Sequence, residues 1–201
     1  YARGEGAGIL VLRPLERAQA EGDRIYAVIR ATGSNQDGRT PGITVPNPKA
    51  QAELIREVTA RSGLAPSEVG YVEAHGTGTA VGDPLEMEAI GRMLGAVDGR
   101  TETLRVGSIK ASIGHTEAAA GVASVIKAAL TLYHRTIVPQ GWLNELNPDI
   151  PFSDYRLSVP LAVEPFPESY ALPAASVNGF GYGGTNAHAI LVAAPAAGES
   201  T

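Results

Sequence analysis

Cysteine is absent from the 201-residue sequence, which excludes disulfide bonds, thiolate metal ligands and a cysteine nucleophile within the chain. No apolar run approaches the length needed to span a bilayer and no signal peptide is visible, so we expect a cytoplasmic protein without a membrane partner. The net charge is −5 without any block of like charges, which gives a nucleic-acid surface no electrostatic support. The sequence opens without an initiator methionine, inside a glycine-punctuated apolar run, and we expect it to be a piece of something longer.

Several active-site motifs are absent as well. The four histidines are scattered and form no HExxH or comparable ligand cluster, so we expect no metal site. Neither glycine loop carries the lysine and hydroxyl residue of a P-loop, and a GxSxG nucleophile elbow is missing. The chain nevertheless has 44% hydrophobic and 18% charged residues, the ordinary balance of a folded protein.

Apolar periodicity indicates alternating strands and helices. Continuous apolar or β-branched runs predict strands at residues 8–12, 25–32, 69–74, 104–109, 174–178 and 187–192. Helices are predicted within residues 15–22, over 48–63, from 83 onward and over 116–133; turn residues predict a loop from 34 to 48, an irregular stretch over 134–173 with a short strand near 157–159, and a tail or linker over 194–201. This order is typical of an α/β protein with a largely buried sheet.

Two of the predicted helices carry specific start signals. Asn47 followed by Pro48 matches a cap with proline at the first helical position. Asp83 with Glu86 three residues later matches a capping box, with Asp83 as the cap and Glu86 reaching back to it.

His75 lies where the strand over 69–74 meets the loop Gly76-Thr77-Gly78-Thr79. A lone histidine at such a position is more often structural than functional. The loop favours the functional interpretation, because glycines permit close backbone approach and threonines offer hydroxyl donors to a long, thin polar substrate.

His115 closes the stretch "GSIKASIGH" and leads directly into an alanine-rich predicted helix. The positive end of the helix dipole disfavours imidazolium, and Lys110 reinforces that bias. A neutral histidine can donate a hydrogen bond to a developing oxyanion. The alternative is a capping histidine beside a solvated lysine.

The stretch "VNGFGYGGTNAH" places glycines at 179, 181, 183 and 184, a density that signals a turn with special dihedral angles. Backbone N–H groups in such a turn can converge on a negative oxygen, although a plain β-hairpin is the simpler alternative. His188, in the strand that follows, is interpreted as structural, and His134 as a residue at a helix C-terminus.

Four stretches in order carry a resemblance to a known family: "SNQDGRTPGITVPN", "VEAHGTGTAVGDPLE", "VGSIKASIGHTEAAAGVASVIKA" and "SVNGFGYGGTNAHAIL". Together they closely resemble the β-ketoacyl synthase domains of type I polyketide synthases. The resemblance implies the thiolase-like α/β fold, in which two similar halves stack as five αβαβα layers, and a homodimer. Residues 1–30 would be the tail end of the N-terminal half, 31–193 the C-terminal half and 194–201 a tail or linker.

The resemblance also implies a mechanism, a decarboxylative Claisen condensation of an acyl chain with malonyl-acyl carrier protein. It assigns His75, His115 and Lys110 as catalytic, Thr77 and Thr79 as hydroxyls that hold the phosphopantetheine arm of the carrier protein, and Tyr182 as the aromatic gate whose backbone N–H contributes to the oxyanion hole. The resemblance implies no directly bound cofactor, because phosphopantetheine of the carrier protein carries the substrates. The expected partners are acyl carrier protein and the N-terminal ketosynthase half, which bears the nucleophilic cysteine.

Two departures from the family pattern are visible. Ser112 stands where an asparagine is common and Gly179 where a serine is common, and neither implies inactivity. Two alternatives stay open: a non-catalytic ketosynthase fragment acting as a structural or dimerisation module, and a fatty-acid β-ketoacyl synthase, which shares the chemistry.

Overall fold

The structure is a computed structural model that describes residues 1–42 and 45–195. Its helices are α1 (Leu15–Ala20), α2 (Pro48–Ser62), α3 (Gly82–Ile90), α4 (Lys110–Ile113) and α5 (Ala120–His134), with short turns η1 (Pro66–Glu68) and η3 (Glu117–Ala119) and a π-helical segment η2 (Gly91–Gly95). Its strands are β1 (Val28–Gln36), β2 (Val69–Glu73), β3 (Leu104–Gly107), β4 (Thr136–Ile137), β5 (Leu157–Ser158), β6 (Glu164–Pro165), β7 (Ala174–Phe180) and β8 (Thr185–Val192).

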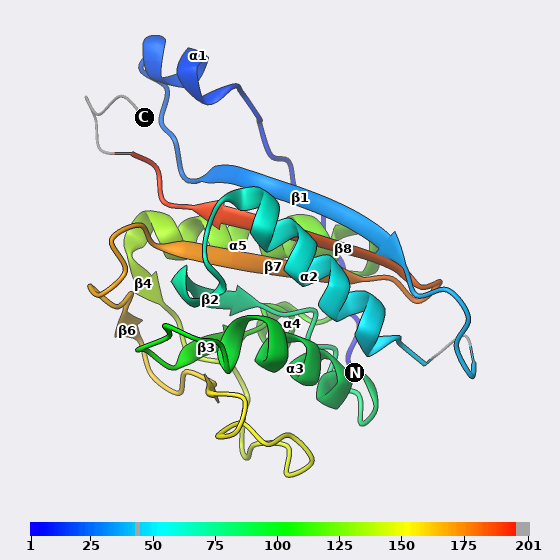
Figure 1. The fold of residues 1–201 in the computed structure, drawn as a ribbon. Coiled ribbons are helices and arrows are strands. Elements are labelled where there is room, and N and C mark those ends of the chain that lie inside the picture. The colour runs from blue at the N-terminus through cyan, green and yellow to red at the C-terminus, as the bar shows by residue number, and fades with distance from the viewer. Residues whose placement is uncertain (43–44, 196–201) are drawn as a thin grey trace.

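Six of these strands form one sheet in the order β1-β8-β7-β2-β3-β5, and β4 pairs with β6 in a small second sheet. β8 runs antiparallel to both β1 and β7, whereas β7, β2, β3 and β5 are parallel neighbours. Helices α2 and α3 lie on one face of the large sheet and α5 on the other (Figure 1). The prediction of an α/β protein with a buried sheet is therefore confirmed.

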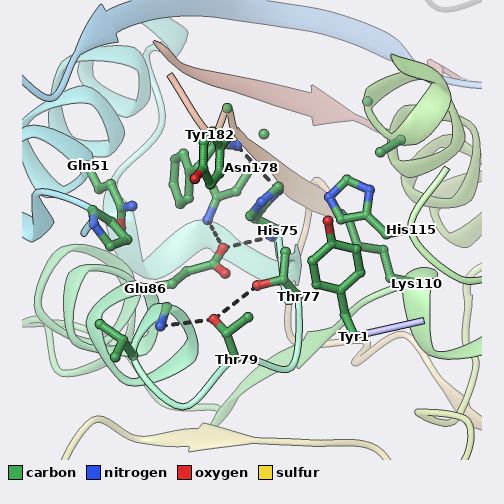
Figure 2. A pocket seen from close by; sticks show the side chains of 18 of the residues that line it. Tyr1, Gln51, His75, Thr77, Thr79, Glu86, Lys110, His115, Asn178 and Tyr182 are labelled. Atoms are coloured by element: carbon green, nitrogen blue, oxygen red, sulfur yellow. Dashed lines mark hydrogen bonds between the residues drawn. The ribbon is translucent and has the colours of Figure 1, made fainter. Parts of the chain in front are cut away.

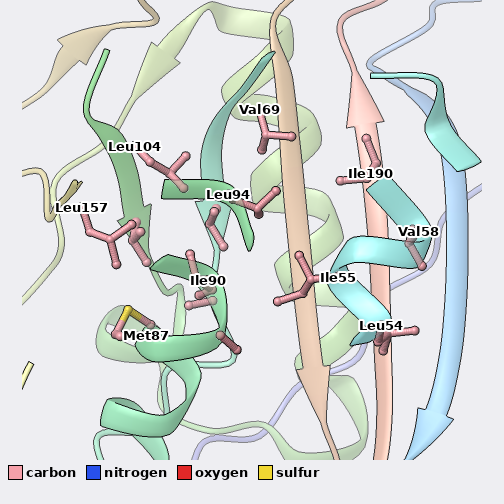
Figure 3. Close-up of a cluster of buried hydrophobic side chains, with 14 of the residues drawn as sticks. Leu54, Ile55, Val58, Val69, Met87, Ile90, Leu94, Leu104, Leu157 and Ile190 are labelled. Carbon is pink, nitrogen blue, oxygen red and sulfur yellow. The ribbon is translucent and has the colours of Figure 1, made fainter. Parts of the chain in front are cut away.

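The core lies on both faces of the sheet. On the α2 and α3 side, Leu54, Ile55, Ile90 and Leu94 pack against the strands in one hydrophobic cluster (Figure 3). On the α5 side, a second cluster includes Tyr71, Leu132 and Phe166. Every residue of β2 is buried, as expected for a central strand that is covered on both faces. Whatever follows β2 in the chain therefore emerges from the middle of the protein.

Helix α2 confirms its predicted start and end. The Asn47 side chain accepts hydrogen bonds from the backbone N–H of Lys49 and Ala50 at 3.1 and 3.4 Å. Pro48 occupies the first turn, and Gly63 ends the helix in the left-handed region with φ of 77°.

Residues 8–12 do not form the predicted strand. A strand needs a neighbour for its backbone N–H and C=O groups, and none pairs with this segment in the described part of the chain. Its apolar side chains face outward, with Ile9 at 88% and Val11 at 91% exposure.

The predicted loop from residue 34 and the predicted strand over 25–32 both begin too early in the sequence, since β1 spans Val28–Gln36. β1 continues to Gln36 because Ser34, Asn35 and Gln36 pair with β8 across the sheet. The boundary expected between residues 30 and 31 falls within β1, so the division into two halves stays a prediction. The other predicted strands and helices are present with shifted ends, the helix over 116–133 beginning as α5 at Ala120.

Two expectations concern the ends of the chain and the membrane. Of the tail expected over 194–201, residues 196–201 lie outside the described residues. Across residues 1–42 and 45–195, none of the helices combines the length and the apolar character that crossing a membrane requires.

Arg100 joins η2, η1 and β2 through side-chain hydrogen bonds. Its buried guanidinium, in a residue with 4% exposure, donates to the backbone oxygens of Leu94, Pro66 and Val69 at 2.7, 2.8 and 2.9 Å. It also donates to the hydroxyl of Tyr170 at 3.0 Å, which ties the segment after β6 to the core.

We predict that Arg100→Met lowers the free energy of unfolding by about 3 kcal/mol, because buried carbonyls lose their donors. Arg92→Met is the matched control: the exposed Arg92 pairs with the half-buried Glu88 at 2.9 Å, and loss of this ion pair should cost less than about 1 kcal/mol. Urea denaturation of both variants measures the two costs, and equal costs would contradict the assignment of Arg100 as a buried clamp.

Candidate active site

All six predicted site residues line one cavity of about 640 Å³ (Figure 2). They come from four places in the chain: the loop after β2, the start of α4, the segment before α5 and the β7–β8 turn. The residues are His75, Thr77, Thr79, Lys110, His115 and Tyr182. The structure thus brings together side chains that are up to about a hundred residues apart in sequence.

His75 follows the buried strand β2 directly and has a defined tautomer. The backbone N–H of Phe180 donates to its Nδ1 at 3.3 Å, so the proton of the neutral ring lies on Nε2. Burial, then the charge of Lys110 and the neighbouring His115, lowers the pKa of His75 to about 3. The ring is therefore a neutral donor at physiological pH.

His115 presents a second Nε2–H donor to the cavity. The backbone N–H of Glu117 donates to its Nδ1 at 3.0 Å, which again leaves the proton on Nε2. Burial and Lys110 lower its pKa, although Glu117 opposes them. The rings of His75 and His115 lie edge to face with their centroids 5.7 Å apart. Two neutral imidazoles, each with an Nε2–H donor, thus share the cavity.

Lys110 is the first residue of α4 and is buried beside the two histidines. Burial lowers its pKa, while the carboxylates of Glu86, Glu73 and Asp83 act in the opposite direction. These surrounding carboxylates favour the ammonium form. Its charge in turn disfavours a second positive charge on either imidazole.

The capping box predicted for Asp83 and Glu86 is wrong. The N-cap residue of α3 is Val81, whose side chain cannot cap the helix, and Asp83 instead accepts the backbone N–H of Gly78 at 3.1 Å. The carboxylate of Glu86 accepts the backbone N–H groups of His75 and Gly76, both at 2.8 Å. Glu86 bonds to the end of β2 and not to the start of its own helix, because these two N–H groups have no strand partner.

Asn178 on β7 completes the hydrogen bonds of Glu86. Its Nδ2 donates to Glu86 Oε1 at 2.9 Å. Burial raises the pKa of Glu86, whereas the three N–H donors favour the carboxylate. Sequence reasoning missed Asn178 and the role of Glu86; the available signal was an acidic residue just before the apolar positions Met87 and Ile90 of a helix.

Gly76 permits the sharp turn that aims His75 into the cavity. Its φ of 47° is in the left-handed region, and a Cβ atom there would lie 2.7 Å from the Cβ of Ser108. Beyond it, the hydroxyls of Thr77 and Thr79 lie 3.3 Å apart, and Thr79 also accepts the N–H of Gly82 at 3.1 Å. Both hydroxyls line the cavity, as the sequence led us to expect.

A second buried carboxylate, Glu73, fixes the start of α4. Its oxygens accept the Tyr71 hydroxyl at 2.7 Å and the backbone N–H of Ile109 at 2.6 Å, and they pair with Lys127 at 2.8 Å. Because Ile109 directly precedes Lys110, Glu73 positions that lysine next to His75. The sequence offered no clear signal for this contact.

The glycine-rich stretch is a β-hairpin turn between β7 and β8. The N–H groups of Gly181 and Gly184 donate to the backbone oxygens of Thr185 and Gly181 at 2.7 and 2.9 Å, so they close the turn and do not face a ligand. Tyr182 lies at the mouth of the cavity with 71% exposure.

His134 is the exposed last residue of α5. Within the described ranges, no group of three or more His, Asp or Glu side chains could hold a metal ion.

Comparison with protein families agrees with this geometry. Residues 26–143 match the model of the β-ketoacyl synthase C-terminal domain, and residues 147–201 match the ketoacyl-synthetase C-terminal extension. The chain belongs to the β-ketoacyl synthase family. The ketosynthase match covers the loop after β2, α4 and the segment before α5, which supply five of the six predicted site residues.

Similar proteins are large fungal enzymes. A highly reducing polyketide synthase of Emericella nidulans is 51% identical over 191 residues, which cover 95% of this chain and 8% of that protein. One of Leptosphaeria maculans is 48% identical over 201 residues, 100% of this chain and 8% of that protein. The ketosynthase chain thus spans under a tenth of the length of these relatives.

Solved structures confirm the thiolase-like ketosynthase fold. The ketosynthase from module 6 of the bacillaene synthase from Bacillus subtilis superposes with a TM-score of 0.84 at 39% identity. The match covers 90% of this chain and 33% of that chain.

We predict that His75 stays neutral in the folded protein as the pH falls from about 8 to about 5, because burial and Lys110 lower its pKa from the usual value near 6.5. The unfolded chain gains a proton on this ring below about 6.5, so His75 makes folding less favourable as the pH falls from there toward about 3. ¹⁵N NMR of the imidazole measures the pKa of His75 in the folded protein, and the same measurement on the urea-unfolded protein is the control. A His75 that titrates alike in both states would refute the assignment.

Proposed function

We propose that this chain supplies the decarboxylation half of the β-ketoacyl synthase site in a polyketide synthase. The reaction would be the decarboxylative Claisen condensation of an acyl chain with malonyl-acyl carrier protein. One observation carries the proposal: two neutral imidazoles present Nε2–H donors in the same cavity, 5.7 Å apart between ring centroids.

The chemistry of decarboxylation requires such donors. When the bond between the malonyl carboxylate and Cα breaks, carbon dioxide leaves and the electron pair passes toward the thioester carbonyl, whose oxygen becomes an enolate. His75 and His115 donate to this oxygen from Nε2. Donors of this kind are worth on the order of 10²–10³ each in rate.

The enolate carbon then forms the new bond. It attacks the carbonyl of an acyl thioester held on a cysteine, and the cysteine sulfur leaves as the carbonyl re-forms. The product is a β-ketoacyl chain on the carrier protein. This chain contains no cysteine, so another segment supplies that nucleophile.

The remaining cavity residues have supporting roles in the proposal. Burial and, after it, the positive charge of Lys110 keep both histidines neutral. Thr77 and Thr79 offer hydroxyls to the amides of a phosphopantetheine arm, which itself belongs to the substrate. Tyr182 forms the gate at the mouth of the cavity, and its backbone N–H contributes to the oxyanion hole for the attacked thioester.

The partners follow from the same proposal. The N-terminal half of the ketosynthase brings the cysteine and covers the outward-facing apolar residues Ile9, Val11 and Leu12. Acyl carrier protein delivers the malonyl group, and the complete enzyme is a cytoplasmic homodimer. The names of the similar fungal proteins support a polyketide synthase over a fatty-acid synthase.

We predict that His75→Ala in the complete enzyme reduces malonyl decarboxylation by about 10²–10³, since it removes one donor to the enolate oxygen. Self-acylation of the cysteine should be largely retained, because His75 does not serve that step. Release of labelled carbon dioxide measures decarboxylation, and trapping of the acyl-enzyme measures acylation.

His134→Ala is the matched control, because His134 is an exposed histidine at the end of α5 and should leave both steps unchanged. Decarboxylation at the wild-type rate in His75→Ala would refute the catalytic assignment. Absence of decarboxylation in the wild-type enzyme would favour the alternative, a ketosynthase-derived structural or dimerisation module.

A further inference from the structure

A third histidine, His188, is buried in β8 behind the cavity. It has 2% exposure and lies opposite Asn178 in the β7–β8 pairing. Its Nδ1 is 2.6 Å from Asn178 Oδ1. The neighbouring residues of β8 are apolar, with Ala187 and Ala189 on either side and Ile190 beyond. A histidine is therefore an unexpected residue at this position of the core.

The hydrogen-bond polarity at His188 follows from Glu86. The Glu86 carboxylate can only accept, so the Asn178 side chain must direct its Nδ2 toward Glu86 and its Oδ1 toward His188. Asn178 Oδ1 is an acceptor, and His188 Nδ1 is consequently the donor. Neutral His188 then carries no proton on Nε2.

This arrangement leaves a buried group unsatisfied. His188 Nε2 has no hydrogen-bond partner in the portion of the chain that the structure describes. An unpartnered buried nitrogen is unfavourable, and an apolar side chain of similar size would avoid that cost. The Nδ1–H donor to Asn178 is the one polar contact that a leucine could not reproduce.

Asn178, the partner of His188, is connected to His75 in two ways. Through Asn178 Nδ2 and Glu86 it reaches the backbone N–H groups of His75 and Gly76. Along β7, Asn178 lies two residues before Phe180, whose N–H donates to His75 Nδ1. A shift of Asn178 would therefore disturb both the backbone position of His75 and its ring.

We propose that His188 is a positioning residue for His75, acting from the neighbouring strand β8 through Asn178 and Glu86. The inference rests on the proposed decarboxylation, in which His75 Nε2–H must meet the developing enolate oxygen. Small displacements of a catalytic group have large effects on rate, and a hydrogen-bonded supporting side chain limits them. His188 touches no substrate in this account.

Two substitutions with the same number and branching of side-chain heavy atoms test the Nδ1–H donor of His188. His188→Asn keeps an N–H group at the position of Nδ1, whereas His188→Leu removes it. In the complete synthase we expect His188→Leu to lower kcat for malonyl decarboxylation about tenfold, the equivalent of one hydrogen bond. KM for malonyl-acyl carrier protein and self-acylation of the cysteine should be unchanged, and His188→Asn should restore most of kcat.

A double-mutant cycle with Asn178→Ala tests the relay itself. If His188 acts through Asn178, the double variant should lose no more activity than Asn178→Ala alone. Fully additive losses, or equal losses in His188→Leu and His188→Asn, would overturn the proposal. If His188→Leu fails to fold, Asn178→Ala replaces it, and a wild-type decarboxylation rate in that variant would also overturn the proposal.

The controls separate this inference from the proposed function. If His75→Ala decarboxylates normally, the assignment of His75 fails and the role of His188 fails with it. If His75→Ala is impaired while His188→Leu is as active as the wild type, the catalytic assignment stands and the positioning role alone is wrong.

Discussion

The carboxylate of Glu86 is the contact on which the site depends. A central parallel strand that ends in the protein interior leaves backbone N–H groups without partners, and buried N–H groups must be satisfied. Glu86 accepts two of them at the end of β2 and a third N–H from Asn178 on β7. One side chain on α3 thereby joins a strand end, a helix and a neighbouring strand, and His75 lies at that junction.

The electrostatics of the cavity follow from this burial. A carboxylate without such donors would favour the neutral acid, and the strand end would lose its acceptor. Glu73 and Glu86 instead remain available as acceptors and surround Lys110, whose charge disfavours protonation of His75 and His115. Both rings also use Nδ1 as an acceptor for a backbone N–H, from Phe180 and Glu117, which orients Nε2–H into the cavity. Burial, the hydrogen bonds to Nδ1 and the neighbouring charge all favour neutral rings that carry their proton on Nε2.

The sequence could predict residues whose position is set by local structure. Strand-end and loop patterns drew attention to His75, Lys110 and His115, the family resemblance assigned them to the site, and Asn47 followed by Pro48 predicted the start of α2. Glu86 was misassigned because its partners are set by the tertiary fold: it lies 11 residues from His75 and 92 from Asn178. Glu73, 36 residues from Ile109, was missed for the same reason. Residues 8–12 show the converse, since their apolar pattern favours a strand that has no neighbour to pair with.

The central claim is that the Nε2–H groups of His75 and His115 converge on one oxygen. A crystal structure of the complete enzyme with a malonyl-thioester analogue that cannot lose its carboxylate tests this directly. The account predicts both Nε2 atoms within about 3.2 Å of the same thioester oxygen. Nε2 atoms bonded to different parts of the analogue, or one of them beyond about 4 Å from that oxygen, would contradict it.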